Sequence, residues 1–471
     1  MKKLFLIILF VSKTIFANDL PELGSHFDNI LTKNDEKKIT HQIMSQVYQS
    51  GSVITDAEVN DYLKTLGTNL SLAGTQDKLN FKLFIINDPS INAFAMLGNI
   101  IGVHTGLIFA ANSESELASV LSHEIAHITQ KHLLRLFDDQ AKNSYKTYLG
   151  IAIALLAARS NPQISQAAIM ASNAAVTQNI LNFTRQNERE ADQIGLEILS
   201  RSGYDPRGFI DFFQTIQRFN EFSTGPAPSF LKTHPITSER ISDIQDRLKN
   251  YSFKQDSSKI EFFFVKAKLK AYLGNENNIT EAFLREIKDK RSINENASYF
   301  GLVYSFIRKN KIIDARKYFN ILKKYNIESP MLIQLEAILL AKEMKYQDAY
   351  ELYLKGLSNF PSYRAFIYGV ANLLIDSGKI DESIEFLNKK VDLFNNDFIL
   401  FELLAKAYSL KNFKLHEHEN LSSAYYFKYN INEAITQMEI ATKSEDGIFF
   451  DQSRVEFKLQ ELKKEAEALY N

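Results

Sequence analysis

Short strand-like runs of hydrophobic residues alternate with helix-length patterns in the first half of the chain. Residues 81–86 are rich in apolar side chains and end at a turn that contains Asn, Asp and Pro, which is typical of a β-strand. A second strand is predicted over residues 99–107. After it, Ser113 and Glu116 form a capping-box pattern that predicts the start of a long helix. Residues 18–250 are therefore expected to form a domain that combines helices with a small β-sheet.

Two strongly apolar segments, at 149–158 and 167–176, follow the predicted long helix. Polar residues and Pro162 separate them, and each is much shorter than the ~20 apolar residues that a membrane-spanning helix needs. We expect either two packed helices or a mobile cover over a cleft, and no stable transmembrane anchor.

The second half of the chain, from about residue 255, is a series of helix-length blocks that are poor in Gly and Pro. Small residues recur in these blocks at intervals of 34 residues, at Ala315, Ala349 and Ser383. This is the period of the tetratricopeptide repeat, and a small residue lets the two helices of a repeat cross closely. Residues 255–471 are thus predicted to form an α-helical solenoid with a concave partner-binding surface, the alternative being an irregular helical bundle. The whole chain is expected to be α+β, but mainly α.

The first 17 residues have the pattern of a secretory signal peptide. A basic start at Lys2 and Lys3 precedes the apolar run of residues 4–11, and the small residue Ala17 stands at a suitable cleavage point. We expect residues 1–17 to be removed after Ala17, so that the mature protein acts beyond the inner membrane. A retained N-terminal anchor or a buried terminal helix is the alternative.

Charge and composition narrow the possible chemistry. The 471 residues include 55 Lys and Arg against 56 Asp and Glu, a net charge of -1, which gives no electrostatic reason to expect nucleic acid as a partner. The absence of Cys excludes disulfides, thiolate metal sites, thiol nucleophiles and lipidated cysteine anchors. Any metal ion must therefore be held by His and carboxylate side chains.

A candidate metal-binding motif lies in the predicted long helix and consists of His123, Glu124 and His127. Residues four apart share a helix face, so both imidazoles can bind one ion, and neutral imidazole suits zinc. Glu124 lies beside the ion without binding it and can take a proton from a zinc-activated water that attacks a carbonyl. The motif predicts a zinc hydrolase, the alternative being a surface helix with two solvated histidines.

The third ligand has to come from a distant part of the chain. If the helix of His123 continues, His132 faces away from His123, and Asp138 and Asp139 lie roughly 16 Å further along the same helix. The first suitable donor after them is Glu188.

A cluster of acidic residues supplies this donor. Glu188 and Asp192 are four residues apart and share a helix face, which Gly195 continues. We assign Glu188 as the third zinc ligand and Asp192 as the acceptor that orients a ligating histidine. Gly195 is expected to let this helix approach the first one closely, while Glu190 points elsewhere as a solvated or ion-paired residue. Without the first motif, an ordinary charged helix start would explain this cluster.

A third element of interest is the segment 231–241, in which His234 precedes Pro235 and is followed by Arg240. The residue before a proline favours an extended or turn conformation, so His234 is expected in a loop just ahead of a helix. A single histidine in a loop is usually incidental, and the residues alone leave its contribution to the site open.

These motifs together resemble the zinc metallopeptidase family that includes the CAAX-prenyl proteases and the HtpX-like membrane proteases. The family has HExxH, a distant ExxxD and a late motif around His-Pro, and the matching positions here are His123, Glu124, His127, Glu188, Asp192, Thr233, His234, Pro235 and Arg240. The segments 92–95 and 103–107 resemble the strand that borders the family's substrate cleft. The resemblance covers about residues 40–250.

The resemblance implies a zincin-like endopeptidase in which Glu124 is catalytic. It further implies that His234 is a removable extra zinc ligand that holds the enzyme at rest, and that Arg240 acts in the transition state. The apolar segments at 149–176 fall where the family has a mobile cover.

A signal peptide, this catalytic domain and a tetratricopeptide array resemble one periplasmic subgroup of the family in Gram-negative bacteria. The resemblance implies quality control of outer-membrane proteins, in which barrel precursors are assisted in assembly or degraded when they stall. The expected partners are unfolded or stalled outer-membrane proteins and, through the solenoid, the outer-membrane barrel assembly machinery. The alternative is a chaperone or docking platform whose proteolysis is gated or vestigial.

Overall fold

The computed structural model of the chain describes residues 32–74, 81–138, 174–222, 228–252, 254 and 258–470. These residues are mainly helical and include one small sheet, so the expected fold class, α+β but mainly α, is confirmed. Among the helices described, none has both the length and the apolar character that crossing a bilayer requires. The predicted signal peptide, 1–17, lies outside the described residues, as do the predicted apolar segments up to the start of a helix at Ala174.

The described sheet has three short strands, β1 (Lys82–Ile86), β2 (Ala93–Met96) and β3 (Ile100–His104). The central strand, β3, pairs with β1 in parallel and with β2 antiparallel, which leaves β2 at an edge. The predicted first strand is confirmed. The predicted second strand ends early, at His104, because a short helix, α3 (Thr105–Ala110), begins there.

Besides α3, eight described helices lie before residue 250, and several of them pack against one of their number, α4. They are α1 (Lys33–Gln49), α2 (Ala57–Gly74), α4 (Glu114–Thr129), α5 (His132–Asp138), α8 (Ala174–Arg201), α9 (Gly208–Phe222), α10 (Ser229–Thr233) and α11 (Ser238–Leu248). The helix α4 is buried along most of its length and packs against α2, α8, α9 and β2. Its start is capped as predicted, because the Ser113 hydroxyl accepts a hydrogen bond from the Glu116 amide.

The helix α4 ends at Thr129, earlier than the sequence analysis assumed. Lys131 has a φ of 51°, in the left-handed region, and a new helix, α5, starts at His132. The assumption of one continuous helix up to Asp138 is therefore wrong, and side chains after Lys131 take a new direction.

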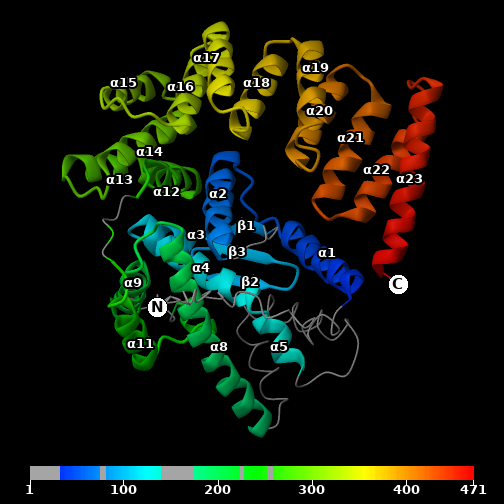
Figure 1. The fold of residues 1–471 in the computed structure, drawn as a ribbon. Helices are drawn as coiled ribbons and strands as arrows, with labels where there is room; N and C mark the ends of the chain where they lie inside the picture. The colour runs from blue at the N-terminus through cyan, green and yellow to red at the C-terminus, as the bar shows by residue number, and fades with distance from the viewer. Residues whose placement is uncertain are drawn as a thin grey trace, which may run out of the picture.

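The helices after residue 258 form a curved array (Figure 1). They are α12 (Ile260–Leu273), α13 (Glu276–Lys288), α14 (Glu295–Arg308), α15 (Ile312–Lys323), α16 (Pro330–Lys342), α17 (Tyr346–Asn359), α18 (Arg364–Asp376), α19 (Ile380–Val391), α20 (Phe398–Leu410), α21 (Lys414–Phe427), α22 (Ile431–Thr442) and α23 (Phe449–Tyr470). Ala315, Ala349 and Ser383 are fully buried near the starts of α15, α17 and α19, each of which packs on the helix before it. The predicted solenoid architecture is confirmed, whereas its boundary at residue 255 stays a prediction.

The solenoid curves over α2 and the sheet, and its last helix returns to α1 (Figure 1). At this end, Lys37 Nζ of α1 lies 2.7 Å from Glu465 Oε1 of α23. In the middle, Arg364 of α18 pairs with Asp61 of α2. The solenoid therefore contacts the first half of the chain at more than one place.

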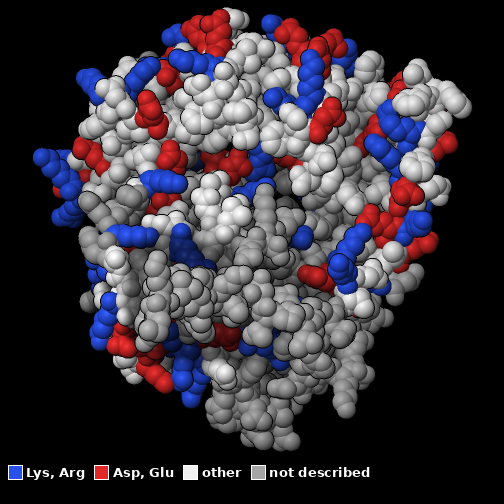
Figure 2. Space-filling model, viewed as in Figure 1, with Lys and Arg blue, Asp and Glu red and all other residues white. Residues whose placement is uncertain are grey.

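The solenoid surface carries mixed charge. Figure 2 shows Lys and Arg side chains beside Asp and Glu side chains over much of the upper part of this face. Such neighbours form ion pairs between helices, for example Lys463 of α23 with Glu439 of α22 at 2.7 Å. On this face, the part of the chain that the structure describes therefore presents both signs of charge close together.

Candidate metal centre

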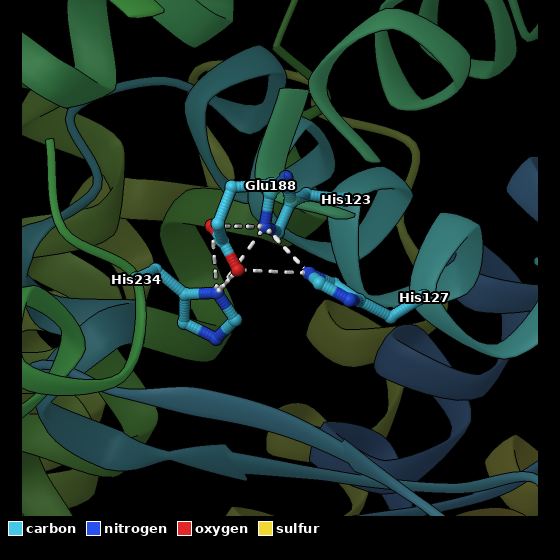
Figure 3. Close-up of side chains that lie close together, drawn as sticks. All are labelled: His123, His127, Glu188 and His234. Carbon is cyan, nitrogen blue, oxygen red and sulfur yellow. Dashed lines mark hydrogen bonds and ion pairs between the residues drawn. The ribbon is translucent and has the colours of Figure 1, made fainter. Parts of the chain in front are cut away.

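Four side chains from separate parts of the chain converge at one point (Figure 3). His123 and His127 come from α4, Glu188 comes from α8, and His234 caps the end of α10. One ligand atom of each residue lies within 4.8 Å of the others. Three of the four residues are buried and His127 is half-buried, so the cluster lies below the surface.

The distances between these atoms suit a tetrahedral metal ion. His123 Nε2 lies 3.0 Å from His127 Nε2 and 3.3 Å from Glu188 Oε2. His127 Nε2 lies 3.4 Å from Glu188 Oε1, and His234 Nδ1 lies 3.0 Å from the same oxygen. A tetrahedron with metal–ligand bonds of about 2.0–2.1 Å has edges of about 3.3–3.4 Å, so these donors fit zinc.

A close contact between α4 and α8 brings the two motifs together. Gly195 of α8 faces the backbone of His123, and a Cβ at Gly195 would lie 3.1 Å from the His123 nitrogen. The same Cβ would lie 2.9 Å from the Phe209 ring. A side chain at this position would push α8 away from α4, so Gly195 permits the close approach that the sequence predicts.

A buried carboxylate lies beside the second ring nitrogen of His123. Asp192 Oδ1 lies 3.0 Å from His123 Nδ1, where the sequence predicts an orienting acceptor. Arg240 donates two hydrogen bonds of 2.6 Å to Asp192, and its Nη1 lies 2.9 Å from Glu188 Oε2. The structure thus brings Asp192, Glu188 and Arg240 to the same place as the two histidines of α4.

Electrostatic interactions keep both carboxylates ionised. Burial raises the pKa of Glu188, but the influence of His234 and hydrogen bonds from the three histidines outweigh it, so the pKa lies well below its usual value. Burial opposes ionisation of Asp192 too, but the charge of Arg240 and the bonds that Asp192 accepts lower its pKa. Burial lowers the pKa of His123, yet hydrogen bonds to Asp192 and Glu188 raise it to about 9. A metal ion therefore has to displace a proton from His123.

Glu124 has the surroundings of a proton acceptor. Its side chain is 1% exposed, and its Oε1 has no hydrogen-bond partner among the described residues. This oxygen lies 3.4 Å from His234 Nε2. A buried carboxylate oxygen without a hydrogen bond is costly, which calls for a water molecule or a ligand beside it. Glu124 can therefore accept a proton from a water molecule at the site.

His132 also reaches the site, so the prediction that it faces away is wrong. The break at Lys131 turns it back, and its Nδ1 lies 2.8 Å from His127 Nδ1. Its Nε2 lies 3.3 Å from Glu190 Oε2, and Arg135 pairs with the same oxygen at 3.1 Å. Burial, together with His127 and Arg135, lowers the pKa of His132 to about 3, so its ring is neutral. The sequence predicts that Glu190 points away from the site as a solvated or ion-paired residue. It is ion-paired, with Arg135, but it points towards His132 beside the site.

Sequence reasoning missed His132 and Arg135 as neighbours of the metal site. It treated α4 and α5 as one helix, and the helix period then placed His132 on the wrong face. The sequence carries little signal for this break, because neither Gln130 nor Lys131 is a typical helix terminator such as Gly or Pro.

The edge strand β2 lies next to the helix that carries the histidines. It packs against α4, and the Ile91 carbonyl just before it accepts a 3.0 Å hydrogen bond from the Phe230 amide of α10, the helix that leads to His234. Asn92 is fully buried, and neither polar atom of its side chain has a hydrogen-bond partner among the described residues. The segment 92–95, which resembles a cleft strand, therefore borders the candidate site.

Comparison with known proteins agrees with this geometry. Residues 55–248, which include all four donors, match Peptidase family M48. The chain is 28% identical over 451 residues to the Beta-barrel assembly-enhancing protease of Escherichia coli O157:H7, an alignment that covers 95% of this chain and 92% of the relative.

Two further relatives match over a smaller part of the chain. The Putative beta-barrel assembly-enhancing protease of Vibrio cholerae serotype O1 is 36% identical over 251 residues, which is 53% of this chain and 52% of the relative. The Mitochondrial metalloendopeptidase OMA1 of Schizosaccharomyces pombe is 31% identical over 189 residues, which is 40% of this chain and 52% of the relative.

Proposed function

We propose that the chain is a zinc endopeptidase, from the premise that its residues 55–248 match Peptidase family M48. The prediction of a metallopeptidase is confirmed by the family match and by the metalloendopeptidase relatives. The identity of the ion and of its ligands is our proposal, namely zinc bound by His123, His127 and Glu188. The observation that carries it is the spacing of their donor atoms, 3.0–3.4 Å, which suits a tetrahedral zinc site.

The proposed reaction is hydrolysis of a peptide bond. When bound, zinc supplies polarisation of the scissile carbonyl and makes water more acidic. Glu124 takes the proton of the attacking water and passes it to the leaving amine. The buried Oε1 of Glu124 supports this role, because it has no hydrogen-bond partner among the described residues and so keeps its lone pairs available.

Arg240 is proposed to act by positioning. Its guanidinium binds Asp192, lies 2.9 Å from Glu188 and donates a hydrogen bond to the Pro235 carbonyl. These contacts keep Asp192 against His123, which supports a role in orienting that ligand. A transition-state role for Arg240, which the family resemblance implies, stays a prediction.

His234 is proposed as a removable fourth donor. Its Nδ1 lies 3.3 Å from His123 Nε2 and 3.0 Å from Glu188, and its Nε2 lies 3.4 Å from Glu124. A catalytic zinc site keeps one position open, whereas a fourth protein ligand closes it. A closed site supports a resting state of the enzyme. It also favours the alternative function, a chaperone or docking protein whose proteolysis is gated.

The substrate is proposed to lie as an extended strand along β2. In the described sheet this strand pairs only with β3, and an unpaired strand edge can add a peptide by backbone hydrogen bonds. Because β2 packs against α4, a peptide at this edge lies beside the helix of His123 and His127. Backbone pairing requires an extended chain, so unfolded polypeptides are the proposed substrate class.

The biological setting is proposed from the relatives and the sequence pattern. We propose a periplasmic protein, with a peptidase domain over 18–250 and a tetratricopeptide-repeat domain over 255–471, that acts on unfolded or stalled outer-membrane proteins. The support is the 28% identity to a Beta-barrel assembly-enhancing protease over 95% of this chain. The solenoid is proposed to hold clients and to contact the outer-membrane barrel assembly machinery. N-terminal sequencing of the mature protein tests the export step, with Asn18 expected as the first residue and Met1 contradicting it.

Removal and return of the metal ion tests the proposed function. The purified protein is expected to contain about one zinc ion per chain. Casein hydrolysis, measured for the wild type and for His234→Ala, is expected to stop with a chelator and to return with added zinc. His127→Ala should lose both zinc and hydrolysis, whereas the control His418→Ala, in α21, should keep both. Hydrolysis that survives complete removal of zinc contradicts the proposal.

A further inference from the structure

A chain of polar contacts runs from the second ring nitrogen of His127 to the edge of the site. His127 Nδ1 lies 2.8 Å from Nδ1 of His132, a residue that is only 4% exposed. His132 Nε2 lies 3.3 Å from Glu190 Oε2, and both Nη atoms of Arg135 donate to the same oxygen at 3.1 Å. Arg135 Nε also donates to the Gln130 carbonyl, at 2.8 Å, at the end of α4. The contacts thus connect a proposed ligand to a fixed point on its own helix.

The direction of these hydrogen bonds follows from the chemistry of the groups. An ionised carboxylate only accepts, so His132 Nε2 carries a hydrogen that points to Glu190. A 2.8 Å contact between two ring nitrogens needs one donor and one acceptor. With the hydrogen of His132 on Nε2, its Nδ1 is the acceptor, so the hydrogen between the two rings belongs to His127 Nδ1. The lone pair of His127 is therefore on Nε2, the atom that lies 3.4 Å from Glu188 and 3.0 Å from His123 Nε2.

We propose that His132, Glu190 and Arg135 form a positioning relay that holds His127 in the tautomer and orientation that bind the metal ion. This inference rests on the proposed function, because it assumes that a metal ion binds at the site. Groups that hydrogen-bond to the non-ligating ring nitrogen of a metal-binding histidine fix the orientation of the ring and strongly affect metal affinity. His123 has a separate relay, through Asp192 and Arg240. His127 and His123, one helix turn apart, are thus each held at Nδ1 by a different partner, His132 in one case and Asp192 in the other.

Zinc affinity tests the relay in the full-length protein. The dissociation constant for zinc is measured by competition with a chromophoric chelator for the wild type, His132→Leu, His132→Asn and Glu190→Gln. The matched control is Glu197→Gln, which changes an exposed carboxylate of the same helix that pairs with Arg201. Thermal unfolding of the metal-free proteins reports folding, and kcat and KM for casein are measured at saturating zinc.

The relay predicts a graded loss of affinity. His132→Leu removes the acceptor for His127 Nδ1 and should weaken zinc binding about 10- to 100-fold. His132→Asn should recover most of this loss, because its side-chain oxygen can accept the same hydrogen bond. Glu190→Gln should show an intermediate loss, since an amide no longer imposes one tautomer on His132. KM should stay unchanged in all variants, and Glu197→Gln should bind zinc like the wild type.

Three results overturn the relay. They are a wild-type affinity in His132→Leu, a loss in His132→Asn as large as that in His132→Leu, and equal affinities of Glu190→Gln and Glu197→Gln. If His132→Leu does not fold, the comparison of Glu190→Gln with Glu197→Gln is the deciding test. If the wild type binds zinc but neither it nor the His234→Ala variant cleaves casein, the proposed function is overturned. The relay is then still tested by the zinc affinities of the variants. A wild type that binds no zinc overturns both.

Discussion

At the scale of single residues, the candidate site depends on which ring nitrogen each histidine turns inward. The spacing of His123 and His127 places both rings on one face of α4 but does not decide how each ring is rotated. Asp192 lies at Nδ1 of one ring and His132 at Nδ1 of the other. Both rings therefore direct Nε2 towards Glu188, at 3.3 and 3.4 Å.

The first prediction at this scale concerns His234. If this side chain occupies the open position of the zinc site, His234→Ala should raise the kcat for casein several-fold, because water gains access to Glu124. Zinc should stay bound, since three ligands remain. The comparison is casein hydrolysis by the wild type, His234→Ala and the control His418→Ala at equal zinc content. An unchanged or lower rate in His234→Ala counts against the gating role.

At the scale of elements, the contact between α4 and α8 sets the position of Glu188 relative to the two histidines. Gly195 marks this contact, where a Cβ would lie 3.1 Å from the His123 nitrogen and 3.2 Å from its Cα. Backbone atoms of a buried helix cannot move aside as the end of a flexible side chain can. The separation of the two helices at this point is therefore fixed by the absence of a side chain.

Substitution of this glycine should separate the helices. Gly195→Val is expected to lower the free energy of unfolding by about 1–3 kcal/mol, through overpacking, and to weaken zinc binding because Glu188 moves away. The control is Glu197→Val, which places the same side chain on an exposed position of α8 and should change stability by no more than about 0.5 kcal/mol. Both quantities are measured by denaturant unfolding and zinc competition. Wild-type zinc affinity in Gly195→Val would show that the contact does not set the site.

The C-terminal helices are joined by a buried carboxylate. Glu419 of α21 accepts hydrogen bonds of 2.9 and 2.8 Å from Arg454 and of 2.8 Å from Lys458, both on α23. Burial raises the pKa of Glu419, but hydrogen bonds from His416, Arg454 and Lys458 outweigh it, so the pKa lies well below its usual value. The ionised form therefore stabilises the packing of α23.

This carboxylate gives a defined pH dependence. Because its pKa is lower in the folded protein, its contribution is fully present above the unfolded pKa of about 4.3 and is lost as the pH falls further, towards the folded pKa. Glu419→Gln should lower stability by about 1–3 kcal/mol near neutral pH, and the difference from the wild type should shrink below about pH 4. Thermal unfolding of both proteins across this range tests it. An equal difference at about pH 7 and about pH 3 contradicts the assignment.

At the scale of the whole molecule, a buried ionic cluster joins the solenoid to the peptidase half. Lys268 of α12 lies 2.5 Å from Glu58 and 2.6 Å from Asp56. Glu58, at the start of α2, also accepts hydrogen bonds from Tyr363 at 2.7 Å and Tyr304 at 3.2 Å. Three parts of the solenoid thus meet one carboxylate of the peptidase half.

Loss of the cation should leave this carboxylate buried and unpaired. Lys268→Met is expected to lower the free energy of unfolding by about 3–5 kcal/mol, and the double variant with Glu58→Gln should recover part of the loss. The control Lys270→Met removes a partly exposed pair with Glu286 and should cost no more than about 1 kcal/mol. Denaturant unfolding of the four proteins tests this. Equal stability of Lys268→Met and Lys270→Met would show that the cluster does not hold the halves together.

The sequence was informative where a pattern is local and uninformative where the partner is distant. His123 and His127 could be paired from the sequence because residues four apart share a helix face. Glu188 was assigned only because the nearer candidates, His132, Asp138 and Asp139, were placed out of reach. The position of His132 was not predictable, because it depends on a helix break at a single residue. The contact of Lys268 with Glu58, 210 residues apart, follows only from the packing of the two halves.

Glu124→Gln tests the central claim most directly, because it separates metal binding from catalysis. Gln has the shape of Glu but cannot take a proton, and Glu124 is not among the proposed ligands. The variant should bind zinc with the affinity of the wild type and hydrolyse casein about 10²–10⁴-fold more slowly, also when combined with His234→Ala. Hydrolysis at the full rate by Glu124→Gln, with zinc bound, would contradict the account.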